Sequence, residues 1–154
     1  MRQGDPLSPL LFCIAEDVLS RSLSKLVEQG ILEQMAGIRN TKVPSHILYV
    51  DDIMIFCKGE RSCVDALIEL FTKYAQESGQ KVNHNKSTIY SGSISSAILD
   101  QLINIIGFNH GTLPFTYLGA PIFKGKLKAR YLQPIADKIK SKLSAWKASL
   151  LSIA

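Results

Sequence analysis

Long apolar segments are absent from this sequence. No run approaches the ~20 consecutive apolar residues that a membrane-crossing helix needs. The first residues, Met1 to Pro6, contain no apolar core of the kind that marks a secretory signal peptide. Both absences predict a protein that stays inside the cell, in the nucleus or cytoplasm, and is not secreted. A hydrophobic content of 46% and a charged content of 20% over 154 residues are ordinary for one globular domain with its own core.

Cysteine is also scarce, with only Cys13, Cys57 and Cys63 in the chain. An odd number of cysteines without zinc-ligand spacing predicts reduced thiols and no disulfide framework. A zinc site that combines Cys57 and Cys63 with His46 or His84 is the alternative, and the spacing of these residues does not favour it.

Positive charge is concentrated at one end of the chain. Residues 1–123 contain ten Lys/Arg and twelve Asp/Glu, a balance of −2, whereas residues 124–154 contain eight Lys/Arg and only Asp137, a balance of +7. Such an asymmetry is typical of a segment that faces a polyanion. A solvated lysine face would give the same charge balance, so both interpretations stay open on charge alone.

Hydrophobic periodicity predicts an α+β fold, in which a small antiparallel sheet is backed by helices. The expected helices are residues 8–27, 60–77, 95–106 and 130–153. The expected strands are residues 86–91 and 115–122, besides two apolar runs at 46–50 and 53–57. Asp5, followed by Pro6, is expected to cap the first helix, and Gly79 is expected to end the second. The last helix carries an apolar stripe from Leu132 to Leu150.

The two apolar runs flank the pair Asp51-Asp52. Short runs rich in β-branched and aromatic residues across a two-residue gap predict a tight β-hairpin. Asp-Asp is a poor turn, because neither residue is glycine and two like charges are forced together, and such a local conflict is typical of a functional site. The following residues are expected to share one core: Leu48, Ile55, Leu67, Phe71 and Leu118.

The carboxylates of Asp51 and Asp52 predict a divalent metal at the hairpin tip. Adjacent carboxylates repel each other unless a cation neutralises them. Hard oxygen ligands without a neighbouring thiolate or imidazole cluster favour Mg²⁺ or Mn²⁺. An Asp-Asp dipeptide alone is more often a hydrated turn, but the flanking strands indicate a tip that is carried on a packed sheet and so favour the metal.

Four motifs together resemble the reverse transcriptases, RNA-directed DNA polymerases, of the non-LTR retrotransposon type. In the order of the family they are RQGDPLSPLLF from Arg2 to Phe12, YVDD from Tyr49 to Asp52, GQKVNHNKS from Gly79 to Ser87, and YLGAP from Tyr117 to Pro121. Each motif alone is weakly specific, whereas four in order over residues 2–121 are strongly so. The resemblance implies that residues 1–123 are the C-terminal half of a polymerase palm and that residues 124–154 begin a basic, helical thumb.

The resemblance also implies a role for each motif in nucleotidyl transfer from a dNTP to a DNA primer on an RNA template. Asp51 is expected to be a direct metal ligand and Asp52 a supporting one, while Lys86 would lie near the nucleotide phosphates. The remaining site residues fall into three groups: Arg2, Gln3, Gly4 and Tyr49 near template and nucleotide; Tyr117, Leu118 and Gly119 near the primer grip; and Lys138, Lys140 and Lys142 near the nucleic-acid backbone. A plain surface lysine at position 86 is the alternative to a catalytic one.

The match to the family is incomplete at the start of the chain. The remaining metal-binding aspartate of the family lies on a strand well before the Arg-Gln-Gly segment, and here Met1 stands directly before Arg2. Asp5 does not obviously replace it, because it precedes a proline at a helix start. Val50 stands where non-LTR enzymes more often carry alanine. Two carboxylates are too few to order two Mg²⁺ ions, so we expect a polymerase fragment that is inactive alone.

A second hypothesis is a non-catalytic remnant of a retroelement that binds nucleic acid, or acts as a scaffold, through the basic C-terminal helix only. The intact pair Asp51-Asp52 favours recent descent from an active enzyme, because a scaffold has no use for carboxylates that repel each other.

Overall fold

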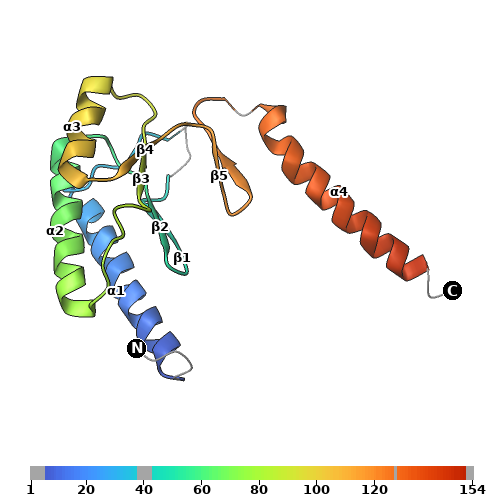
Figure 1. Ribbon diagram of the computed structural model, residues 1–154, viewed down its shortest axis with the longest axis horizontal. Coiled ribbons are helices and arrows are strands. Elements are labelled where there is room, and N and C mark those ends of the chain that lie inside the picture. The colour runs from blue at the N-terminus through green and yellow to red at the C-terminus, as the bar shows by residue number, and fades with distance from the viewer. Residues whose placement is uncertain (1–5, 38–42, 127, 152–154) are drawn as a thin grey trace. The chain divides into compact units, whose positions relative to one another are not determined.

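The computed structural model describes residues 6–37, 43–126 and 128–151, and the side chains of residues 148–151 lie outside the description. The described elements alternate helices with short strands (Figure 1). In chain order they are α1 (Ser8–Glu28), β1 (His46–Tyr49), β2 (Asp52–Ile55), α2 (Arg61–Ser78), β3 (Thr88–Tyr90), α3 (Ser96–Ile106), β4 (Asn109–Gly111), β5 (Phe115–Tyr117), β6 (Ala120–Ile122) and α4 (Ala129–Leu151). This mixture confirms the α+β class. None of the described helices is both long and apolar enough to cross a membrane.

The chain divides into two compact units. Unit 1 comprises Met1–Ile89 with Ile94–Asn109, and unit 2 comprises Tyr90–Ser93 with His110–Ala154. The functional boundary that the sequence suggests after residue 123 stays a prediction.

The expected helices are present with ends shifted by at most two residues. Gly79 ends α2 and Gly107 ends α3, with φ of 73° and 72°, a left-handed conformation that glycine adopts without steric cost. Ser95 caps α3, where its hydroxyl accepts a hydrogen bond from the Ile98 amide. The start of α1 differs, because Leu7 occupies the N-cap position and makes no side-chain cap, while Asp5 lies outside the described residues.

The sheet arrangement differs from the single sheet expected. Among the described residues the strands form three two-stranded sheets, β1–β2, β3–β4 and β5–β6. Residues 115–122 form a hairpin and not one strand, because Leu118 and Gly119 adopt φ of 50° and 82° and reverse the chain. The short polar strand Asn109–Gly111 was not predicted, since its side chains show no apolar alternation.

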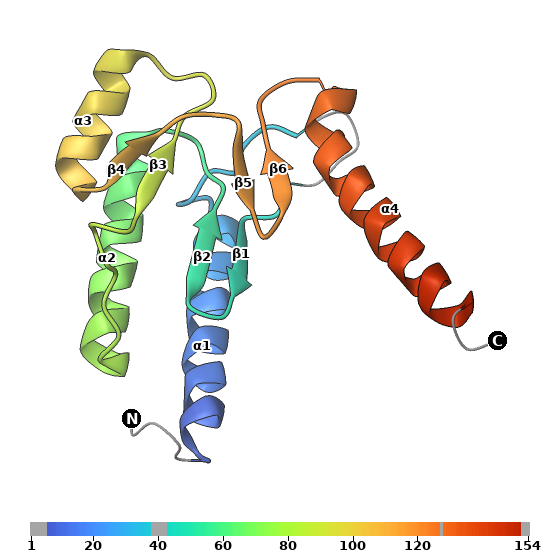
Figure 2. The ribbon, with the colours of Figure 1, turned by 45° about the vertical axis from the view of Figure 1, so that its right-hand side comes forward.

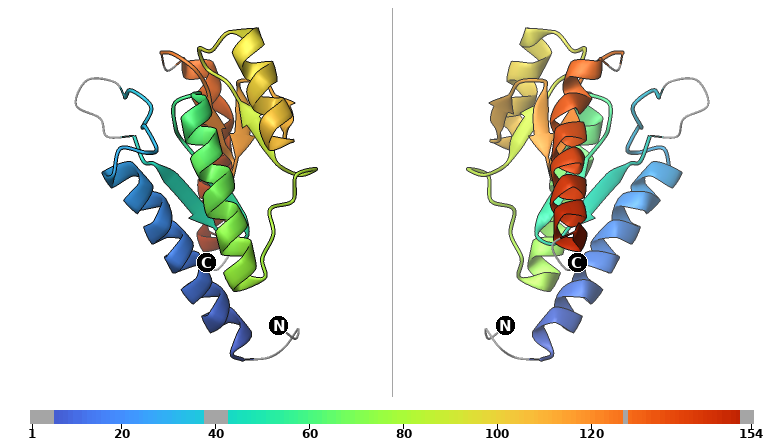
Figure 3. Two further views of the ribbon diagram at one scale, coloured as in Figure 1. Left: turned by 90° about the vertical axis from the view of Figure 1, so that its left-hand side faces the viewer. Right: turned by 90° about the vertical axis from the view of Figure 1, so that its right-hand side faces the viewer.

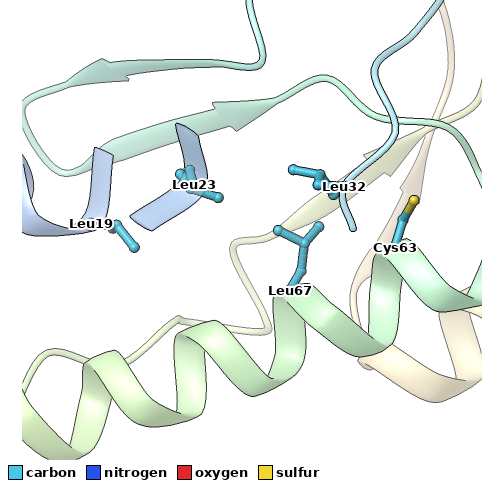
Figure 4. Close-up of a cluster of buried hydrophobic side chains, with 5 residues drawn as sticks. All are labelled: Leu19, Leu23, Leu32, Cys63 and Leu67. Carbon is cyan, nitrogen blue, oxygen red and sulfur yellow. The ribbon is translucent and has the colours of Figure 1, made fainter. Parts of the chain in front are cut away.

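One core of unit 1 lies between α1 and α2. Figure 4 shows its five buried side chains pointing toward one another, two from each helix and one from the segment after α1: Leu19, Leu23, Leu32, Cys63 and Leu67. Both helices contribute residues four positions apart, so one face of each meets the other. A second cluster uses Val64 of α2 with Leu102 and Ile106 of α3. Helix α2 is therefore packed on two sides.

The predicted core is confirmed in part. Leu67 is buried, Ile55 and Phe71 pack against the first cluster, and Leu48 is half-buried. Leu118 is wrong as a core residue, because it occupies the β5–β6 turn in unit 2 and is 58% exposed.

The β1–β2 hairpin is antiparallel, and its register moves the turn by one residue. Tyr49 pairs with Asp52, so the two turn residues are Val50 and Asp51, where the sequence suggested Asp51 and Asp52. This register separates the two carboxylates between the turn and the first position of β2. Val50 consequently adopts a φ of 53°, which is strained for a β-branched residue.

A partly buried polar network joins α1 to α2 and to the segment after α2. The Tyr74 hydroxyl lies 3.4 Å from Glu16 Oε1 and 2.9 Å from Gln80 Oε1. Glu16 Oε2 is buried without a hydrogen-bond partner among the described residues. Burial raises the pKa of Glu16, and the hydrogen bond from Tyr74 opposes this rise only in part.

In unit 2, helix α4 packs on β6, and aromatic pairs bind its elements together. The rings of Tyr90 and Phe115 stack with centroids 3.8 Å apart, and those of Phe123 and Tyr131 stack at 4.7 Å. Farther along α4 the apolar stripe is exposed, with Ile139, Leu143 and Trp146 each more than half accessible.

We expect Glu16→Gln to raise the free energy of unfolding at neutral pH, because it removes a charge that burial disfavours. The folded-state pKa of Glu16 lies above its unfolded value. The contribution of Glu16 to folding stability is therefore fully present below the unfolded pKa and is lost as pH rises through the folded pKa. Urea unfolding between pH 4 and pH 8 should show a flatter pH dependence for Glu16→Gln. The exposed Glu69→Gln on α2 is the matched control, and an equal effect of both changes would contradict the interpretation.

We expect Val50→Gly to stabilise unit 1 by roughly 0.5–1 kcal/mol. Glycine relieves ~1–2 kcal/mol of left-handed strain, and this gain exceeds the roughly 0.5–1 kcal/mol that its greater freedom in the unfolded chain costs. Val50 is 64% exposed, so little apolar burial is lost. The measurement is the urea midpoint at unchanged slope. Val50→Ala retains Cβ and the strain and should gain nothing, whereas a glycine variant less stable than the parent would show that the turn is unstrained.

Candidate functional site

Asp51 and Asp52 lie at the exposed end of the β1–β2 hairpin, as predicted. Neither carboxylate forms an ion pair within the described part of the chain. Tyr49 is directly opposite Asp52 and therefore shares its face of the hairpin, and its side chain is 53% exposed. The two acidic groups and the tyrosine are thus brought together on one small, accessible surface.

The hairpin is anchored to α1 at its base. Figures 2 and 3 show β1 and β2 beside α1, with α2 also packed on that helix. Ile53 and Ile55 reach the core around Leu19 and Leu23. The flanking strands therefore carry the acidic tip on a packed support, as the sequence suggested.

His46 provides a polar contact at the same base, and sequence reasoning missed this role. Its Nε2 lies 2.8 Å from the Ser20 hydroxyl of α1, and its Nδ1 lies 2.9 Å from the Ser45 hydroxyl. Burial lowers the pKa of His46, so the neutral imidazole is favoured at neutral pH. The sequence holds no periodic signal for this contact, because it joins residues 26 positions apart.

Lys86 is exposed in a turn that other residues hold in place. Asn83 accepts hydrogen bonds from the amides of Lys86 and Ser87, at 3.1 and 3.0 Å. Asn109 donates from its side chain to the Asn85 carbonyl at 2.8 Å and from its amide to the Ser87 carbonyl at 2.9 Å. Among the described residues the Lys86 side chain forms no ion pair with the hairpin. Its catalytic role therefore stays a prediction.

The zinc alternative finds no support in the described ranges. They contain no group of three or more His, Cys, Asp or Glu side chains able to hold a metal ion. Burial, with a smaller contribution from Cys63, raises the pKa of Cys57 to about 11. Its thiol therefore stays protonated at neutral pH, and a protonated thiol is a poor zinc ligand. The oxygen donors of Asp51 and Asp52 fit a hydrated Mg²⁺ or Mn²⁺.

The other predicted site residues lie apart from the hairpin in the chain. Tyr117 pairs with Ala120 at the end of the β5–β6 hairpin, and Leu118 and Gly119 form its turn. Lys138, Lys140 and Lys142 are all exposed on α4. Lys138 and Lys142 share one side of the helix, because four residues separate them, and Lys140 lies on the other side of the apolar stripe. Arg2, Gln3 and Gly4 lie outside the described residues.

Comparison with known proteins agrees with the motifs. A protein of Arabidopsis thaliana named as an uncharacterized mitochondrial protein is 42% identical over 52 residues. That match covers 34% of this chain and 43% of the relative, so the chain spans less than half the length of that protein.

Residues 1–122, about four fifths of the chain, match the family described as reverse transcriptase (RNA-dependent DNA polymerase). This range includes the acidic hairpin and all four motifs. A match over this much of the sequence means that the chain belongs to the reverse transcriptase family.

Proposed function

We propose that this chain is part of an RNA-directed DNA polymerase of the non-LTR retrotransposon type. In this proposal residues 1–123 are the C-terminal half of the palm, and residues 124–154 begin the thumb. The observation that carries the proposal is the pair Asp51-Asp52 at the end of a hairpin whose strands reach the core, within a chain of this family. The protein would work inside the cell, on an RNA template, a DNA primer and dNTPs.

Asp51 and Asp52 would bind divalent ions at the hairpin tip. Two Mg²⁺ or Mn²⁺ ions, when bound in such a polymerase, activate the primer hydroxyl and stabilise the leaving pyrophosphate. The exposed turn position lets Asp51 act as a direct ligand, while Asp52, fixed opposite Tyr49, supports it. Ile53 and Ile55 keep the strand in place, so the carboxylates are oriented before a metal arrives.

The neighbouring side chains would handle nucleotide and primer. Tyr49 presents an exposed ring on the same face as Asp52, where it would pack beside the primer terminus. Lys86 projects from a turn held by Asn83 and Asn109, which suits a cation that meets nucleotide phosphates. Arg2, Gln3 and Gly4 would approach the template and the incoming nucleotide, and the Tyr117–Gly119 turn would lie near the primer.

The hairpin supplies only two carboxylates. This small number of metal ligands supports the proposal that the chain does not polymerise DNA by itself. Two Mg²⁺ ions need more oxygen ligands than Asp51 and Asp52 offer. A second candidate function, non-catalytic binding of nucleic acid, is favoured by the charge of residues 124–154, a balance of +7.

We expect the purified 154-residue chain to show no extension of a DNA primer on an RNA template with Mg²⁺ or Mn²⁺. The hairpin should still hold one hydrated Mn²⁺ ion weakly, with a dissociation constant on the order of 1 mM, measurable by electron paramagnetic resonance. Asp51→Asn should weaken this binding, and the exposed Asp100→Asn on α3 should not. Templated extension that vanishes in Asp51→Ala would refute inactivity.

We expect residues 124–154 to bind nucleic acid without sequence preference and with strong salt dependence. On a duplex, log K should fall by ~0.9 for each phosphate neutralised per decade of salt. Replacing Lys138, Lys140 and Lys142 with glutamine should weaken binding to all sequences alike and reduce that slope by about two to three units. Fluorescence anisotropy at several salt concentrations measures both effects. A triple variant with unchanged affinity and slope would leave these lysines as a solvated face.

A further inference from the structure

Unit 2 contains a hollow of about 220 Å³ lined by the β5–β6 hairpin, the residues before it and the first turns of α4. Its lining is mainly flat and apolar, and among the described residues Arg130 is the one cationic residue that lines it. The residues that matter here are Pro114, Phe115, Pro121, Arg130, Tyr131 and Pro134. The volume lies below the ~300–1,000 Å³ of sites for drug-sized ligands, so it suits about one flat ring system.

Both aromatic rings of the hollow are held in place by a second aromatic ring. Phe115 stacks on Tyr90 with ring planes 15° apart, and Tyr131 stacks on Phe123 with planes 19° apart. Each of the two rings thus contacts another aromatic ring, the Arg130 guanidinium also lies over the Tyr131 ring, and both residues line the hollow. Rings fixed in this way lose little conformational entropy when a ligand stacks on them.

Arg130 adds an exposed cation to the same wall. Its Nη2 donates a hydrogen bond to the Tyr131 hydroxyl at 3.2 Å, and its guanidinium carbon lies 5.1 Å from the centre of the Tyr131 ring. This hydrogen bond is the main reason that the pKa of Tyr131 is lowered. A guanidinium has five N–H donors, so others remain to meet a phosphate oxygen.

We propose that this hollow binds one unstacked base of a single-stranded nucleic acid, with Arg130 on a neighbouring phosphate. The rings of Phe115 and Tyr131 and the proline surfaces match the flat face of a base, and the excess of positive charge on residues 124–154 attracts its backbone. A base inside a duplex is stacked on both faces and cannot enter. This inference rests on the proposed nucleic-acid function and adds a preference for unpaired strands.

The test compares two single strands of equal length and charge, a thymidine oligomer and one made entirely of abasic sites. The full 154-residue chain should bind the thymidine strand about 5- to 150-fold more tightly, as expected for one stacked base. Phe115→Leu and Tyr131→Leu should bring this ratio close to one, while Tyr131→Phe, which keeps the ring, should preserve it. Trp146→Leu is the matched control, because that exposed ring does not line the hollow, and its ratio should stay unchanged.

The three possible failures are distinguishable. If neither strand binds, both the proposed nucleic-acid function and the pocket are overturned. If both strands bind with equal affinity and the expected salt dependence, only the pocket is overturned. If the ratio survives both leucine variants or collapses in Trp146→Leu, the base stacks elsewhere.

A second measurement keeps the proposal testable if the leucine variants do not fold. A single strand that carries 5-iodouracil is photo-crosslinked to the unmodified chain, and the attached peptide is identified by mass spectrometry. The crosslink should fall on Phe115 or Tyr131. A crosslink confined to Trp146 or to residues of unit 1 would overturn the pocket.

Discussion

The contact between α1 and α2 holds the rest of unit 1 in place. Leu19, Leu23 and Cys63 are fully buried, and Leu32 returns from the end of α1 to close the same cluster. Truncation of one such leucine to alanine costs about 2–5 kcal/mol, which is a large share of the stability of a small domain. The hairpin rests on this cluster through Ile53 and Ile55. Orientation of Asp51 and Asp52 therefore depends on buried side chains away from the hairpin tip.

Polar contacts fix the positions of segments that the apolar core already holds together. His46 ties the hairpin base to Ser20 of α1, and Tyr74 links Glu16 to Gln80 after α2. Both groups respond to pH in opposite directions, since burial lowers the pKa of His46 and raises that of Glu16. Protonation of His46 in acid therefore lowers the stability of the folded state, and so does ionisation of Glu16 as pH rises. The segments that carry the candidate site residues are thus fixed by groups that also carry a stability cost.

The sequence predicted those parts of the fold whose signals are local. Apolar spacing located α2 and α3 and Gly79 located the end of α2, because a helix face and a left-handed cap are properties of neighbouring residues. The acidic hairpin was predicted, but its register was not, since no local pattern indicates that the β-branched Val50 occupies the turn with a φ of 53°. The contact of His46 with Ser20 and the lining of the Phe115–Tyr131 hollow bring together residues that are not neighbours in sequence. No periodicity reports such contacts.

Helix α2 is packed on two sides, with Cys63 and Leu67 against α1 and Val64 against α3. An element that borders two clusters cannot leave one of them without exposing the other. Its amides should therefore be among the last in unit 1 to exchange with solvent, because they open only when both clusters open. A substitution that loosens either cluster, even far from Asp51, would therefore also loosen the support of the hairpin, because both clusters share α2.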